Sequence, residues 1–288
     1  MVVGEGQPSR RFGARLSAAV AAHGPLCVGI DPHPALLADW GLPDDADGVE
    51  RFGRGVVAAL AGEVALVKPQ SAFFERHGSA GIAVLERLLA DAREAGLLTL
   101  LDVKRGDIGS TMDGYAQAYL ADGAPLAADA ITLSPYLGFG SLDPALELAA
   151  RTGRGVFVLA RTSNPEGASV QAASVQTAAS SGRTVAQVVV DEVAARNAGQ
   201  TPLGDVGVVV GATGEHGLVL TELNGPVLAP GLGAQGATPA DLATRFPRIG
   251  GSVLPAASRS VLRHGPNPAA LRDAVRQLSA ELAAAWPG

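Results

Sequence analysis

Five charged side chains fall within one short stretch behind an apolar run, in a chain that is only 17% charged. They are Asp102, Lys104, Arg105, Asp107 and Asp113. In an extended strand successive side chains point to opposite faces, so Asp102 and Lys104 would share one face and Leu101 and Val103 the other. A charge buried alone costs several kcal/mol. We therefore expect Asp102 and Lys104 to pair with each other at the end of a strand.

Three further residues extend this pair into a candidate array. Lys68 ends the strand predicted before Asp102, Asp107 lies in the loop just beyond, and Thr111 follows one helical turn later. An alternating lysine–aspartate array has two interpretations. It is a structural ion-pair network between neighbouring strands, or a set of fixed charges for a reaction in which charge develops, since charges already in place need not reorganise.

The elements that must position these groups alternate along the chain. Short apolar, strand-like runs are each followed by a helical stretch, and this pattern predicts an α/β fold, a closed (β/α)8 TIM barrel forming a single domain over residues 1–288. An open doubly wound sheet is the alternative. Polar residues recur at the strand ends, where barrel enzymes carry their active sites. The predicted strands are Leu26–Asp31, Ala65–Gln70, Leu98–Lys104, Ala130–Pro135, Gly155–Arg161, Val206–Ala212, Pro226–Gly231 and Ser252–Ser258.

Helical spacing of apolar residues predicts helices over Ser79–Ala95, Thr184–Asn197 and Pro268–Ala285. Two segments depart from this rhythm. Residues 1–10 are expected to form a flexible N-terminal tail. Residues 166–182 are small and polar, and we expect a flexible surface insertion after the fifth strand, with a lid or a subunit contact as the alternative.

Composition limits the classes of partner. The net charge of −6 argues against nucleic acid and against an anionic membrane surface. No apolar stretch reaches the ~18 residues that a membrane helix needs. The run Leu16–Ala22 behind three arginines imitates a signal peptide but is short, so an ordinary first helix is preferred. The lone Cys27 lies in an apolar run and indicates a buried thiol in a reducing compartment, and we expect a cytoplasmic protein.

A glycine-rich segment over residues 231–236 matches G-x-G-x-x-G, the pattern of dinucleotide-binding loops. It follows the seventh strand rather than the first, and no acidic residue lies near residues 250 to 256, which argues against that interpretation. Loops after the seventh and eighth strands of barrels frequently bind phosphate. Glycine N–H groups, Gln235 and Arg259 would hold the anion there. A plain glycine turn beside a surface arginine is the alternative.

The remaining candidates are weaker. The histidines show no metal-ligand spacing. His33 follows the first strand end, and we expect a solvated loop histidine rather than a residue of the pocket rim. Phe73 and Phe74 just past Lys68 are expected to pack in the core or between subunits.

Together these residues resemble orotidine 5'-phosphate decarboxylases. The stretch 102–108, DVKRGDI, is similar to the family signature D-x-K-x-x-D-I, and Thr111 matches a threonine behind it. Asp31 and Lys68 match the aspartate of the first strand and the lysine of the second. Residues 229–236, APGLGAQG, resemble the family's phosphate loop. Ser258-Arg259 stands where the family often has Gly-Arg, and residues 161–165 with the insertion resemble a longer bacterial subgroup.

The resemblance implies decarboxylation of orotidine 5'-monophosphate to UMP and CO2, the last step of de novo pyrimidine nucleotide synthesis, with no cofactor and no metal. Lys104 would be the general acid that protonates C6, with Asp102 near the substrate carboxylate and Lys68 and Asp107 holding the pair. The implied substrate-binding residues are Asp31, Ile108, Thr111, Ser163, Pro230, Gln235 and Arg259. The implied phosphate-loop residues are Gly231, Gly233, Gly236 and Ser258. Ser163 would contact the pyrimidine, with the adjoining Thr162 as the alternative.

The resemblance also implies a homodimer in which Asp107 and Thr111 reach the site of the other subunit. Two rival functions stay open. A magnesium-dependent 3-keto-gulonate-phosphate decarboxylase or hexulose-phosphate synthase would share Asp102, Lys104 and Asp107. A non-catalytic barrel that binds a phosphate ligand would leave the lysine–aspartate array unexplained.

Overall fold

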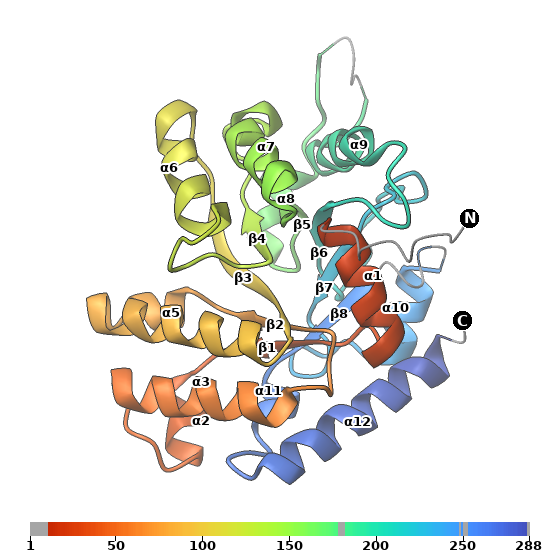
Figure 1. Cartoon of the computed structure of the whole chain (residues 1–288). Helices are drawn as coiled ribbons and strands as arrows, with labels where there is room; N and C mark the ends of the chain where they lie inside the picture. The colour runs from red at the N-terminus through yellow and green to blue at the C-terminus, as the bar shows by residue number, and fades with distance from the viewer. Residues whose placement is uncertain (1–10, 178–181, 248, 250–252, 287–288) are drawn as a thin grey trace, which may run out of the picture.

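Eight parallel strands close into a barrel, each hydrogen-bonded to its neighbours in chain order, in the computed structural model (Figure 1). The structure describes residues 11–177, 182–247, 249 and 253–286. The closed barrel confirms the TIM-barrel prediction and excludes the open doubly wound sheet. The strands are β1 (Cys27–Ile30), β2 (Leu66–Pro69), β3 (Leu98–Arg105), β4 (Ala130–Leu133), β5 (Gly155–Arg161), β6 (Val206–Val210), β7 (Val227–Pro230) and β8 (Val253–Ala257).

Helices surround this barrel and follow local signals in the sequence (Figure 1). Asp45, Thr184 and Asn267 each accept a main-chain hydrogen bond in the first turn of their helices, and Thr238 forms a reciprocal capping box with Asp241. The helices are α1 (Phe12–His23), α2 (Pro34–Asp39), α3 (Ala46–Leu60), α4 (Ala72–Glu75), α5 (Gly78–Glu94), α6 (Gly109–Leu120), α7 (Asp143–Thr152), α8 (Ala168–Gln171), α9 (Val185–Asn197), α10 (Pro239–Arg245), α11 (Arg259–Leu262) and α12 (Pro268–Ala285), with 3-10 turns η1 (Phe139–Leu142) and η2 (Pro165–Gly167).

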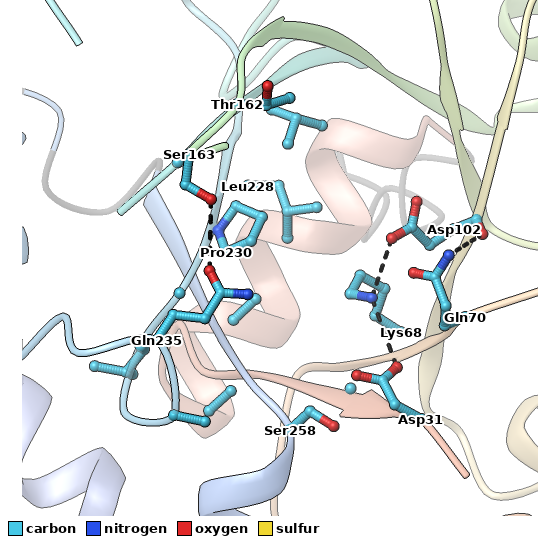
Figure 2. Close-up of a pocket in the computed structure, with 18 of the residues that line it drawn as sticks. Asp31, Lys68, Gln70, Asp102, Thr162, Ser163, Leu228, Pro230, Gln235 and Ser258 are labelled. Atoms are coloured by element: carbon cyan, nitrogen blue, oxygen red, sulfur yellow. Dashed lines mark hydrogen bonds and ion pairs between the residues drawn. The ribbon is translucent and has the colours of Figure 1, made fainter. Parts of the chain in front are cut away.

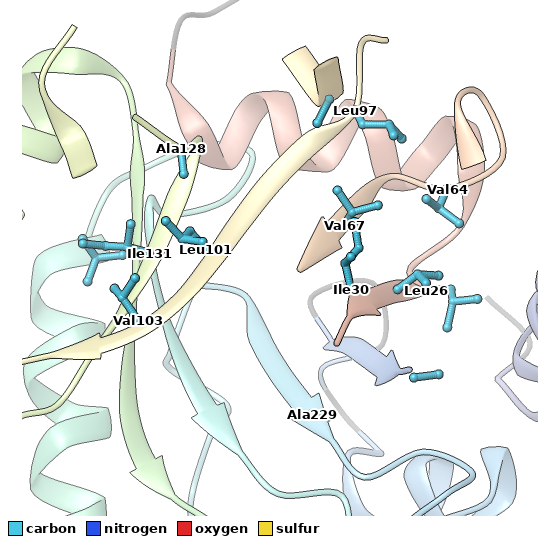
Figure 3. Packing of buried hydrophobic residues seen from close by; sticks show 14 of the residues in the cluster. Leu26, Ile30, Val64, Val67, Leu97, Leu101, Val103, Ala128, Ile131 and Ala229 are labelled. Atoms are coloured by element: carbon cyan, nitrogen blue, oxygen red, sulfur yellow. The ribbon is translucent and has the colours of Figure 1, made fainter. Parts of the chain in front are cut away.

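Alternation along the strands divides the apolar side chains into two cores. Leu101, Val103 and Ile131 face outward and pack under the helices (Figure 3). Leu100 and Phe157 belong to a second cluster that fills the barrel. Since Leu100 and Asp102 lie two residues apart on β3, the inward face that is apolar in the middle of the barrel becomes charged at its end.

The first helix closes the opposite end of the barrel. Phe12 is fully buried and packs edge-on against Phe157, with ring centroids 6.0 Å apart. Arg15 forms an ion pair of 2.5 Å with Asp129, just before β4, and the N–H of Gly13 donates to Asp205, just before β6. The N-terminal apolar run is therefore a structural helix, as preferred over a signal peptide.

The insertion after β5 lies at the surface, and part of it is helical. Residues 165–171 form η2 and α8, and Ser174 makes an isolated antiparallel bridge with Thr184. Neither short helix has a buried residue. The predicted tail over residues 1–10 and residues 178–181 of the insertion lie outside the described residues.

Two further predictions concern single features. Cys27 is fully buried, and burial raises the pKa of its thiol to about 12, so the expected buried thiol is confirmed. Among the described residues, no helix has the length and apolar character needed to cross a membrane.

Candidate active site

A pocket of about 340 Å³ opens at the carboxyl ends of the strands (Figure 2). Its walls come from the ends of β1, β2 and β3 on one side and from the loops after β5, β7 and β8 on the other. Most of the predicted site residues line it, although they are spread over more than 200 positions of the chain. These lining residues are Asp31, Lys68, Asp102, Lys104, Ser163, Pro230, Gly231, Gln235, Ser258 and Arg259.

The predicted lysine–aspartate pairing is present in the structure. Lys104 Nζ lies 2.6 Å from Asp102 Oδ1, and Lys68 Nζ lies 3.2 Å from Asp102 Oδ2. Lys68 Nζ also lies 4.0 Å from Asp31 Oδ1, so that β1, β2 and β3 contribute alternating charges (Figure 2). The side chains of Lys68 and Asp102 are only 9% and 8% exposed, whereas that of Lys104 is 45% exposed. Lys104 is thus the cation of this array that faces an incoming ligand.

Electrostatics keeps the buried members of the array ionised. Burial raises the pKa of Asp102, but the ammonium groups of Lys68 and Lys104 outweigh burial and hold this pKa at about 2. Burial lowers the pKa of Lys68, and the carboxylates of Asp31 and Asp102 overcome this and raise it above its ordinary value. Both groups are therefore charged at neutral pH before any ligand binds.

Two buried oxygens in the pocket wall have no hydrogen-bond partner among the described residues. They are Asp31 Oδ1 and Ser258 Oγ. A Cβ on the intervening Gly29 would lie 2.9 Å from Ser258 Cβ and 3.1 Å from Asp31 Oδ2, so glycine permits this close approach. Because an unsatisfied buried polar group costs about 1–3 kcal/mol, these oxygens point to a hydrogen-bonding ligand.

The glycine-rich loop after β7 supplies the far wall. Gly231 and Gln235 line the pocket, and Arg259 from α11 is exposed beside them. The guanidinium of Arg259 makes no hydrogen bond or ion pair with the side chain or main chain of any described residue. Gly233 and Gly236 do not line this pocket, unlike the prediction. Both have positive φ, and a Cβ on Gly233 would come within 2.9 Å of Ser260, so they shape the loop from behind.

The segment after β5 distinguishes Thr162 from Ser163, which both line the pocket. Gln171 accepts a bond of 2.9 Å from the N–H of Thr162 and donates one of 2.8 Å to its Oγ1. The Thr162 hydroxyl in turn donates to Asn164. Within the part of the chain that the structure describes, Ser163 Oγ makes a single, long hydrogen bond of 3.5 Å, to Gln235 Oε1 (Figure 2). The Ser163 hydroxyl is thus the one left for a ligand.

Three further predicted residues, besides Gly233 and Gly236, do not line this pocket. Asp107 Oδ1 accepts a hydrogen bond from the N–H of Ile108, whose side chain is 61% exposed, and Thr111 is exposed on α6. A position at the surface is what a contribution of these residues to a neighbouring subunit requires.

The structure also corrects and extends the prediction. His33 is not a solvated loop histidine, because it lines the pocket and its ring contacts Phe73 at 4.2 Å between centroids. Phe74 is fully buried, as expected. Thr132 on β4 and Gln70 after β2 also line the pocket and were missed, since a threonine in an apolar run and a glutamine at a strand end are unremarkable by composition.

Comparisons with known proteins agree with this geometry. The sequence profile of the orotidine 5'-phosphate decarboxylase / HUMPS family matches residues 24–274. A relative from Salinispora arenicola named orotidine 5'-phosphate decarboxylase is 61% identical, and the match covers 96% of this chain and 99% of the relative. A relative of the same name from Streptomyces coelicolor is 56% identical, and the match covers 94% of this chain and 96% of the relative.

Solved structures give the same result. The crystal structure titled "putative orotidine 5'-phosphate decarboxylase" from Streptomyces avermitilis aligns with a TM-score of 0.93 and 55% sequence identity, and the alignment covers all of both chains. The structure of Leishmania donovani OMP decarboxylase has a TM-score of 0.77 and 29% identity, covering 96% of this chain and all of that one. The profile match over most of the chain and the high identity to full-length relatives show that this chain belongs to the orotidine 5'-phosphate decarboxylase / HUMPS family of enzymes.

Proposed function

We propose that this protein decarboxylates orotidine 5'-monophosphate to UMP and CO2, the last step of de novo pyrimidine nucleotide synthesis, without a metal or an organic cofactor. The observation that carries the proposal is the Lys68–Asp102–Lys104 array at one end of a pocket, with Lys68 and Asp102 buried and Lys104 half-exposed. The other end of the pocket has a glycine loop and Arg259, whose guanidinium is paired with none of the described residues. The full-length relatives named for this activity support it.

The chemistry follows from the position of Lys104. The bond between C6 and the carboxylate breaks, CO2 leaves, and the electron pair stays on C6. The ammonium of Lys104 stabilises this developing negative charge and then transfers a proton to C6, after which solvent reprotonates the amine. A charge held in place by Asp102 at 2.6 Å need not reorganise during the reaction, which is the main source of electrostatic catalysis.

The neighbouring charges have supporting roles. Asp102 would lie beside the substrate carboxylate, and Lys68 compensates its charge from the buried side at 3.2 Å. Asp31 and Lys68 would bind the ribose hydroxyls, which fits Asp31 Oδ1, since this atom has an ion pair of 4.0 Å with Lys68 but no hydrogen bond among the described residues. Stabilisation of the transition state by Lys104 is the stronger argument, since destabilisation of the substrate by Asp102 is a contested mechanism.

The opposite wall would bind the remote parts of the nucleotide. Gln235, Arg259 and the loop around Gly231 would hold the phosphate, and Ser163 the pyrimidine, with Pro230 packed against the ligand between them. An arginine whose guanidinium is paired with none of the described residues is suited to bind phosphate through two parallel hydrogen bonds. Binding of the phosphate would drive the loops to close around the substrate. The binding energy of this remote group would thereby lower the barrier to reaction at C6.

The active unit would be a homodimer with shared sites. Asp107 and Thr111 lie outside the pocket of the chain that carries them, and in this proposal they complete the pocket of the partner. A reducing compartment suits the single buried Cys27, and we place the enzyme in the cytoplasm.

The first test mixes the purified protein with orotidine 5'-monophosphate, with and without EDTA. Conversion of the substrate is detected as a loss of absorbance. Conversion to UMP that EDTA leaves unchanged supports the proposal. No conversion by folded protein refutes it. Activity on a sugar phosphate that EDTA abolishes would favour the magnesium-dependent rivals, and binding of a nucleotide without turnover would favour the non-catalytic barrel.

Shared sites are tested by mixing two inactive variants, Lys104→Ala and Asp107→Ala. Each mixed dimer would have one pocket with both groups intact. Random reassortment makes about half of the dimers mixed, so about a quarter of wild-type turnover should return. No recovery after subunit exchange, shown with differently tagged chains, would contradict sharing of Asp107. Mixing either variant with itself is the control.

A further inference from the structure

A threonine hydroxyl bridges the backbone and the counter-ion of the proposed general acid. Thr132 lies in β4, is 1% exposed and lines the pocket. Its Oγ1 accepts a hydrogen bond of 2.9 Å from the N–H of Lys104 and donates one of 2.8 Å to Asp102 Oδ1. The same carboxylate oxygen accepts the bond of 2.6 Å from Lys104 Nζ. One hydroxyl therefore contacts both ends of the Lys104–Asp102 pair.

The strand pairing explains why a side chain is needed at this point. Leu101 pairs with Ile131 and Arg105 pairs with Leu133, so that three residues of β3 face the single Thr132 of β4. In this bulge the N–H of Lys104 donates to the Thr132 hydroxyl. Without the hydroxyl, this N–H would lose the partner that the structure gives it, at a cost of about 1–3 kcal/mol.

The main chain of Lys104 is itself strained. Its φ is +45°, a left-handed conformation that costs a non-glycine residue about 1–2 kcal/mol. This conformation turns the end of β3 at the residue that carries the ammonium. Strain of this kind persists only where the surroundings enforce it, and the bond from the Lys104 N–H to the Thr132 hydroxyl is a contact made directly to the strained main chain.

We propose that Thr132 is a positioning residue for the decarboxylation, and that it holds the ammonium of Lys104 in place through its backbone and through Asp102. This inference rests on the proposed function. It assigns Thr132 no contact with the reacting atoms. Its effect should therefore appear in turnover, where the position of Lys104 matters, and not in binding of the nucleotide, which depends on the ribose and phosphate walls.

The test compares Thr132→Val, which removes the hydroxyl at nearly constant shape, with Thr132→Ser, which keeps it. We expect Thr132→Val to lower kcat about 10- to 100-fold, since small misplacement of a catalytic group has effects of this size. KM and the Kd for UMP should change less than about twofold, because the remote contacts are untouched. Thr132→Ser should recover most of the lost turnover.

Thr99→Val is the matched control. Thr99 is 3% exposed on β3, and its hydroxyl donates to Asp129 Oδ2 at 3.1 Å, at the opposite end of the barrel from the pocket. The same chemical change there should lower the melting temperature and leave kcat unchanged. If Thr132→Val has wild-type kcat, or loses no more than Thr99→Val, the positioning role is overturned.

The outcomes separate this inference from the proposed function. A wild-type protein that does not convert orotidine 5'-monophosphate refutes the proposed function, and the inference fails with it. A wild-type protein that converts it, beside a fully active Thr132→Val, refutes the inference alone. Should Thr132→Val not fold, Thr132→Cys replaces it, since a thiol is only a weak donor and acceptor, and unchanged kcat in that variant overturns the inference equally.

Discussion

The contact between Phe12 and Gly155 offers a sharp test of how the barrel is closed. The Phe12 ring from α1 is fully buried, and a Cβ added at Gly155, the first residue of β5, would lie 2.3 Å from ring atom Cδ1. The three atoms nearest to that Cβ all belong to Phe12. The ring, rather than a left-handed backbone, thus excludes a side chain at Gly155.

The size of the effect can be estimated for each substitution. Phe12→Ala removes a fully buried ring and should lower the free energy of unfolding by about 3–5 kcal/mol. Gly155→Ala forces a methyl group into the ring and should cost about 1–3 kcal/mol. In the double variant the methyl group enters space that the ring has left. Gly155→Ala should then cost close to nothing, which gives a coupling of about 1–3 kcal/mol.

The assay is denaturant unfolding of the four proteins at one protein concentration, since association would otherwise shift the apparent stability. Turnover at low temperature is the control and should be unchanged in all four, because the contact lies at the end of the barrel away from the pocket. Equal destabilisation by Gly155→Ala in both backgrounds would refute the argument that this ring decides the glycine.

Three further predictions concern the pocket. Lys104→Ala should nearly abolish turnover while the melting temperature stays near that of the wild type. Arg259→Ala should mainly raise KM. Steady-state kinetics on both variants test this, and a raised KM with normal kcat in Lys104→Ala would contradict it. The pKa of Asp102 is about 2 in the folded protein against 3.8 for the ordinary group, so its carboxylate contributes about 2 kcal/mol of stability above pH 4 that is lost as the pH falls from 3.8 towards 2. Unfolding free energies between pH 5 and pH 2.5 should fall less steeply in Asp102→Asn, and parallel curves would contradict this. Gln171→Ala should weaken UMP binding several-fold, since it frees the segment that carries the pyrimidine contact, while Ser169→Ala on the same short helix should not; calorimetric titration with UMP compares them.

Sequence patterning predicted the barrel because strand alternation and apolar runs are local signals. β5 begins and ends where predicted, at Gly155 and Arg161. β4 was predicted to continue to Pro135 but ends at Leu133, because an apolar run does not reveal where pairing with the neighbouring strand stops. The same alternation placed Asp102 and Lys104 on one face, and their pairing is confirmed.

The residues that were missed depend on contacts between segments distant in the chain. Thr132 is an ordinary β-branched strand residue in the sequence, and its importance arises from a bulge in the adjacent strand that no local pattern predicts. Gln171 lies in a segment of low patterning, and its bonds to Thr162 appear only when the insertion folds back over the end of β5. Contacts of this kind arise from the tertiary structure and leave no pattern in the local sequence.

The concentration of charge behind an apolar run now has a physical reason. Asp31, Lys68, Asp102 and Lys104 contribute two negative and two positive charges, so the array is electrically balanced before a ligand arrives and can be buried in pairs. Under the proposed reaction, loss of CO2 moves negative charge from the substrate carboxylate, beside Asp102, to C6, beside Lys104. The fixed array thus becomes more favourable as the reaction proceeds, because the repelled group leaves and the attracted charge forms next to its cation. An array that lacks either lysine would carry excess negative charge, both in the resting protein and at the transition state. Replacing one lysine alone should therefore impair the reaction.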